Sequence, residues 1–107
     1  MTAKLTTVNP PKHYGFSWPT KGLVQVGPAV PYVIGHKHDV FLDGELIGSI
    51  ETYVHTPHKN IPGTRLRQDL KPRKVWKPIS ERRSRVTYDE RWRAIRVVLE
   101  DHLQPRD

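Results

Sequence analysis

The stretch that decides the fold is HDVFLDGELIGSIETYV, residues 38–54. At its centre, Asp43 and Gly44 are residue types that tolerate positive φ, which a two-residue type I′ turn requires. β-branched and aromatic residues flank this pair on both sides, as is typical of strands. The stretch therefore predicts a β-hairpin.

A two-residue turn also fixes which side chains share a face, because side chains alternate along a strand. It places Val40 opposite Ile47. The two predicted faces are Phe41, Leu46, Ile50 and Val54 on one side, and Val40, Leu42, Ile47 and Tyr53 on the other. Since both faces are apolar, we expect a helix over one and part of the N-terminal segment over the other. Gly48 predicts a bulge or a close backbone approach.

The C-terminal part of the chain predicts one amphipathic helix, residues 88–103. Thr87 and Glu90 have the spacing of a capping box, in which each side chain bonds the other residue's backbone amide. Apolar side chains then recur at the helical period to form the face that covers the sheet: Tyr88, Trp92, Ile95, Leu99 and Leu103. Ion pairs at i, i+4 spacing are expected on the exposed flank: Asp89 with Arg93, and Arg96 with Glu100.

Three further segments complete the predicted fold. Residues 74–79 alternate charged and apolar side chains, as a third and edge strand does. Residues 55–73 show no sustained periodicity and contain three prolines, so we expect a long basic loop. Residues 1–37 carry five prolines and predict an extended arm that can hold a short strand at residues 23–26.

The predicted fold class is therefore α+β. An antiparallel three-stranded sheet, made of hairpin 38–54 and strand 74–79, is packed by the C-terminal helix within a domain of residues 38–107. The chain of 107 residues has no cysteine, which excludes disulfides and thiolate chemistry. It has neither an apolar run of signal-peptide length nor the ~20 apolar residues that a membrane span needs, so we expect a cytoplasmic protein with no membrane partner.

The sequence gives little sign of catalysis. The histidine pairs His36-x-His38 and His55-x-x-His58 resemble metal-ligand spacing, but a zinc site needs three or four ligands, so no metal is expected. No phosphate-binding loop, dinucleotide-binding loop or nucleophile elbow occurs. We therefore expect a protein that is not an enzyme and uses no cofactor.

Positive charge is concentrated in one segment. Ten of the 18 Lys and Arg residues lie between His55 and Val86, opposed only by Asp69 and Glu81, within a net charge of +7. Clustered cations bind phosphates because they release the counterions of those phosphates. The predicted binding residues are Arg65, Arg67, Lys71, Arg73, Lys74, Trp76, Lys77, Arg82, Arg83 and Arg85. The plainer interpretation is a solvated basic loop that confers solubility.

The order of these elements resembles the ββ(β)α layout of phage integrase arm-type DNA-binding domains and AP2-like domains, which place their sheet against DNA. The resemblance spans residues 38–103 and rests on element order together with Gly44, Trp76, Trp92 and Ile95. The long loop and the N-terminal arm depart from that layout, so no base-contacting position carries over. In size, basicity and hairpin sequence, the chain is also similar to small basic proteins of actinobacterial phages, which implies a non-enzymatic binder in the host cytoplasm.

Two functions stay open at this point. The first is a small nucleic-acid-binding module, with DNA favoured over RNA, whose basic segment contacts phosphates. The second is a protein-binding module, such as a phage-type inhibitor or modulator of an acidic host protein. It docks through its basic loop or its exposed strand edge, with strand addition along residues 74–79 as the favoured mode. A homodimer is a further possibility. A ring of Trp76 buried under the helix would disfavour base stacking, whereas an exposed ring among arginines would favour it.

Overall fold

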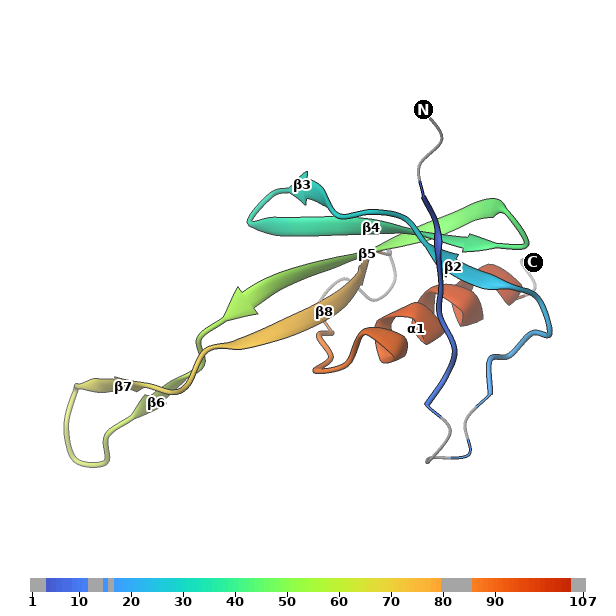
Figure 1. Cartoon of the computed structure of the whole chain (residues 1–107). Coiled ribbons are helices and arrows are strands. Elements are labelled where there is room, and N and C mark those ends of the chain that lie inside the picture. Colours follow the sequence, from blue (N-terminus) through green and yellow to red (C-terminus); the bar gives the residue numbers. More distant parts are fainter. Residues whose placement is uncertain (1–3, 12–14, 16, 80–85, 105–107) are drawn as a thin grey trace.

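The computed structural model describes residues 4–11, 15, 17–79 and 86–104. Its main element is an antiparallel sheet with strand order β1-β2-β4-β5-β8, and β3 pairs with β4 outside this path. The strand bounds are β1 Thr6–Thr7, β2 Val24–Val26, β3 Val30–Tyr32, β4 Gly35–Leu42, β5 Glu45–His55 and β8 Arg73–Ile79. Helix α1, Arg91–Leu103, packs against β5 and β8 (Figure 1). The predicted α+β class is confirmed, but the sheet has more strands than the three predicted.

The predicted hairpin forms β4 and β5. Asp43 and Gly44 have φ angles of 52° and 84°, in the left-handed region that a two-residue turn of this kind requires. Phe41 pairs with Leu46, as a two-residue turn dictates. The conformation of these two turn residues therefore determines which residues pair next to the turn.

A bulge changes that register beyond Phe41. Val40 pairs with Gly48 rather than with Ile47, so Ile47 is the extra residue on β5. Because one extra residue exchanges the two faces of the strand beyond it, the predicted division of side chains is wrong there. Val40 and Ile50, predicted on opposite faces, lie on the same face and are both 0% exposed.

The core lies between this face and the helix. It consists of small and medium apolar side chains: Val8, Val24, Val26, Val40, Ile50, Ala94, Ile95, Val98 and Leu99. Larger side chains pack around its margin: Trp18, Leu42, Ile47, Trp76 and Tyr88. Burying one such aliphatic side chain contributes about 1.5–3 kcal/mol, so this cluster is the main source of stability.

Helix α1 begins at Arg91, later than predicted. Its N-cap is Glu90, which makes no side-chain capping bond, so the predicted capping box at Thr87 is wrong. Tyr88 instead bridges to β8: the Tyr88 amide donates to the Trp76 carbonyl at 2.7 Å, and the Trp76 amide donates to the Tyr88 carbonyl at 2.8 Å. Two backbone bonds to a strand edge hold this residue extended and delay the helix.

The helix surface differs in part from the prediction. Ile95 and Leu99 are buried as expected, whereas Leu103 is 42% exposed and Trp92 is only half-buried. The predicted Arg96–Glu100 pair is present, with 2.9 Å between Nε and Oε1. The predicted Asp89–Arg93 pair is replaced by two others of 3.6 Å, one between Asp89 and Arg73 and one between Arg93 and Glu90.

The described part of residues 1–37 contributes strands to the sheet. β1 pairs with β2, and β2 pairs with β4, which confirms the short strand expected near residues 23–26. The Trp18 indole N–H also donates to the Val8 carbonyl at 3.2 Å. These contacts attach the segment to the sheet edge.

The segment predicted as a long loop forms a β-ribbon instead. β6, His58–Asn60, and β7, Arg67–Asp69, pair antiparallel and continue outward from β5 and β8 (Figure 1). A ribbon exposed on both faces needs no alternation of apolar and polar residues, so the periodicity that reveals half-buried strands is missing here. The loop prediction is wrong for this physical reason.

Candidate functional site

The outermost part of the molecule is the ribbon made by β6, β7 and their turn. We call residues 58–71 the basic ribbon; every one of them is exposed. At its base the Leu70 amide donates to the Pro57 carbonyl at 2.9 Å, and at its tip the Ile61 amide donates to the Leu66 carbonyl at 3.0 Å. Backbone pairing along the ribbon thus determines on which face each side chain lies.

The basic ribbon carries four cations: Lys59, Arg65, Arg67 and Lys71. None of them lies within ion-pair distance of a carboxylate among the residues that the structure describes. The ribbon's own carboxylate, Asp69, contacts the Nδ1 atom of His58 at 2.7 Å. The positive charge of the ribbon is therefore available to an anionic partner.

These cations are distributed around the ribbon. Asn60 pairs with Arg67 and the neighbouring Lys59 pairs with Gln68, so Lys59 and Arg67 lie on opposite faces. Arg65 lies in the turn between the two strands. The ribbon thus presents positive charge on both faces and at the tip.

The predicted binding residues of β8 divide between the two faces of the sheet. Lys74 and Trp76 lie on the face that α1 covers in part. Their partners on β5, Val54 and Thr52, lie at two-residue steps from the core residue Ile50 and so share its face. The two cations of β8 on the opposite face form ion pairs with carboxylates. Arg73 contacts Asp89 at 3.6 Å, and Lys77 contacts Glu51 at 3.7 Å.

Trp76 is a packing residue in this arrangement. Its ring is half-buried and packs against the core cluster. The Lys74 ammonium lies 4.9 Å from the ring centroid, and the His38 ring centroid lies 5.9 Å away. A ring held in this way is a poor platform for a base, so the geometry favours packing over stacking. The other predicted arginines, Arg82, Arg83 and Arg85, fall outside the described residues.

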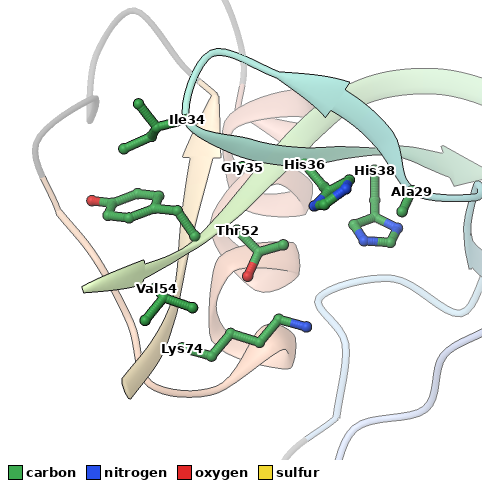
Figure 2. Close-up of a pocket in the computed structure, with 9 residues that line it drawn as sticks. Ala29, Ile34, Gly35, His36, His38, Thr52, Val54 and Lys74 are labelled. Carbon is green, nitrogen blue, oxygen red and sulfur yellow. The ribbon is translucent and has the colours of Figure 1, made fainter. Parts of the chain in front are cut away.

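A pocket of about 450 Å³ lies on the sheet next to the base of the ribbon. Figure 2 shows His36 and His38 beside each other on β4, with Lys74 extending from β8 below Thr52. His38 donates from Nδ1 to the Gly27 carbonyl at 3.0 Å, because a carbonyl oxygen can only accept. Among the described residues, none that lines the pocket carries a carboxylate.

Apolar side chains form the rim of this pocket. Ile34 and Val54, which line it, are 72% and 68% exposed, and Val33 in the adjacent turn is 86% exposed. In the sequence, His36 and His38 have the spacing of metal ligands but lack the further ligands that a zinc site needs. Nothing in the sequence indicates the apolar rim. Within the described ranges, no group of three or more His, Asp or Glu side chains is placed to hold a metal ion.

Comparison of the chain with protein-family models, with curated proteins and with solved structures found no match. Among the described residues, no helix has the length and apolar character needed to cross a membrane. Function must therefore be inferred from the geometry and charge of the basic ribbon and the pocket.

Proposed function

We propose that this protein is a small nucleic-acid-binding module that contacts phosphates through the basic ribbon. The observation that carries the proposal is the exposure of Lys59, Arg65, Arg67 and Lys71 on a projecting ribbon with no described carboxylate paired to them. Cations left unpaired on a surface bind polyanions well, because the released counterions favour the complex.

The shape of the ribbon supports duplex DNA as the partner. Its two strands are narrow enough to enter a groove of the double helix. A groove has phosphates along both walls, which matches a ribbon with Lys59 on one face and Arg67 on the other. A flat acidic protein surface would use the charge of one face only.

The remaining predicted residues are assigned different roles in this proposal. Lys74, at the junction of ribbon and sheet, extends the cationic surface toward the pocket. Arg73 and Lys77 have carboxylate partners and contribute less, since their charge is already offset. We also propose Arg82, Arg83 and Arg85 as phosphate contacts, because they belong to the cationic segment of the sequence.

Paired charge reversals test the proposal. The double variant Lys59→Glu, Arg67→Glu changes both ribbon faces, while Lys4→Glu, Lys21→Glu makes the same change in net charge at exposed positions outside the basic segment. We expect the ribbon variant to lower affinity for a labelled duplex at least tenfold more than the control does, with unchanged thermal unfolding. Equal losses would reduce the effect to net charge and refute a ribbon site.

The apolar rim of the pocket favours protein binding as a second candidate. Val33, Ile34 and Val54 are exposed apolar residues that lie at or next to one pocket, whereas exposed apolar residues on a protein surface are ordinarily scattered singly. The strand-edge mode expected from the sequence is closed in part, because the amide and carbonyl of Trp76 are bonded to Tyr88 and Pro78 has no N–H. A protein partner would therefore dock on the rim.

Substitution of the rim separates the two candidates. Ile34→Asp should abolish capture of a protein partner and leave binding of the duplex intact, because it changes the rim without touching the ribbon. The ribbon charge reversal should do the opposite. If Ile34→Asp left capture of the partner unchanged, the rim would have no part in docking.

A further inference from the structure

The tip of the basic ribbon is apolar as well as cationic. Ile61 and Leu66 face each other across the turn, joined by the bond from the Ile61 amide to the Leu66 carbonyl. Their side chains are 37% and 65% exposed, and Pro62 follows Ile61. Two aliphatic residues thus flank the turn of residues 62–65, and this turn is at the far end of the ribbon (Figure 1).

Hydrogen bonds within the turn brace this tip. Gly63 has a φ of 77°, and the amide and hydroxyl of Thr64 both donate to the Ile61 carbonyl, at 3.1 and 3.0 Å. The Thr64 hydroxyl also accepts from the Leu66 amide at 3.2 Å. A tip ordered by these bonds loses little conformational freedom on insertion into a partner.

A partner for this tip must offer negative charge around an apolar site. Lys59, Arg65 and Arg67 surround Ile61 and Leu66 in sequence and on the ribbon. Duplex DNA has this combination, because phosphates line its grooves and the stacked bases between them are apolar on their faces. Because the ribbon carries cations on both faces, the two phosphate walls of a groove match its charge better than a single acidic protein surface would.

We propose that Ile61 and Leu66 act as an apolar wedge that enters between stacked base pairs of duplex DNA and bends the duplex. The proposal rests on the proposed nucleic-acid function and adds the site of insertion and the deformation that follows. The cations of the ribbon hold the groove walls while the aliphatic pair replaces part of the stacking contact of one base step. Bending then brings further phosphates toward Lys71 and Lys74 at the ribbon base.

Energy transfer between dyes at the two ends of a short duplex tests the wedge. The wild-type protein should raise the transfer efficiency on binding, because bending shortens the distance between the ends. Ile61→Asn, Leu66→Asn should still bind but leave the efficiency close to that of the free duplex. Leu70→Asn is the matched control: the residue is 41% exposed on the same ribbon but lies at its base, and it should bend DNA as the wild type does.

A duplex with a one-nucleotide gap at its centre gives a second readout. Part of the unstacking is already done at a gap, so the wild type should bind it about tenfold more tightly than the intact duplex. The tip variant should lose this preference, whereas the Leu70→Asn control should keep it. All of these positions are exposed, and equal thermal unfolding of the wild type and the two variants checks that folding is unaffected.

The outcomes separate the wedge from the wider function. If the tip variant bends DNA and prefers the gap as the wild type does, the wedge is refuted and the nucleic-acid function stands. If the wild type binds no duplex at physiological salt, both are refuted and the tip belongs to a protein partner. Dimerisation of the wild type that the tip substitutions abolish would assign the tip to a second copy and also refute the wedge.

Discussion

A Cβ atom added at Gly48 would lie 2.7 Å from Cγ1 of Val98, so helix α1 rests directly on the backbone of β5. Gly48 also follows the bulge residue Ile47, where the register of the hairpin changes. The same part of the strand therefore sets the face that is buried and the distance at which the helix packs.

Gly48→Ala should destabilise the fold by about 1–3 kcal/mol, because Val98 is buried and β-branched and cannot move aside freely. Urea denaturation measures the change. The double variant Gly48→Ala, Val98→Ala provides the control, since removal of the Val98 methyl groups relieves the overlap. The two substitutions should be non-additive by at least ~0.5 kcal/mol, and strict additivity would contradict the close approach.

Asp43 connects the hairpin turn to β2. Its Oδ1 atom accepts from the Leu23 amide at 2.8 Å, and its own amide donates to the Leu23 carbonyl at 2.9 Å. Asp43→Ala should cost about 1–2 kcal/mol, through the lost bond and the left-handed φ of 52°. Asp43→Asn keeps an oxygen acceptor and tolerates that φ, so its thermal unfolding should stay near that of the wild type. Equal destabilisation by the two substitutions would count against this role.

The hairpin turn, the C-terminal helix and the short N-terminal strand could be predicted from local sequence, because each depends on neighbouring residues. Gly48 predicts a bulge or a close backbone approach, and both are present there. The identity of Ile47 as the extra residue could not be predicted, since nothing local distinguishes it from a regular pair with Val40. The late helix start at Arg91 depends on the bridge between Tyr88 and Trp76, which lie far apart in the sequence. Long-range contacts of this kind override local helix signals.

Trp76 and Trp92 should differ in their contribution to stability. Trp76 packs against the core cluster, so Trp76→Ala should cost about 3 kcal/mol. Trp92 lies outside that cluster, and its indole N–H donates to Glu90 at 2.7 Å near the helix start, so Trp92→Ala should cost less, about 1–2 kcal/mol. Chemical denaturation ranks the two variants. The reverse order would assign the larger packing role to Trp92.

Removal of the ribbon's negative charge should strengthen binding to nucleic acid. Asp69→Asn makes the ribbon more positive, and we expect about threefold tighter binding to a duplex at low salt. Stability should change by less than about 0.5 kcal/mol, because the His58–Asp69 contact is exposed. Glu45→Gln alters net charge equally at an exposed position beside the hairpin turn. If Glu45→Gln strengthened binding as much, the location of the charge would not matter.

Of the candidate site, the sequence could supply the location of the charge but not its arrangement. The concentration of cations after His55 is visible in composition alone. The opposite faces of Lys59 and Arg67 depend on pairing within a ribbon that has no hydrophobic period. The ion pair between Lys77 and Glu51 depends on the β5–β8 register, so a cation expected at the interface is already partnered.

The most direct test of the central proposal is the salt dependence of duplex binding, measured by fluorescence anisotropy for the wild type and for Lys59→Gln, Arg67→Gln. If both cations contact phosphates, the wild-type log–log slope should correspond to several phosphates, and the variant's slope should be smaller in magnitude by about 0.9 for each cation removed. Binding should persist at physiological salt. Identical slopes for the two proteins, or no binding at physiological salt, would contradict a nucleic-acid site on the ribbon.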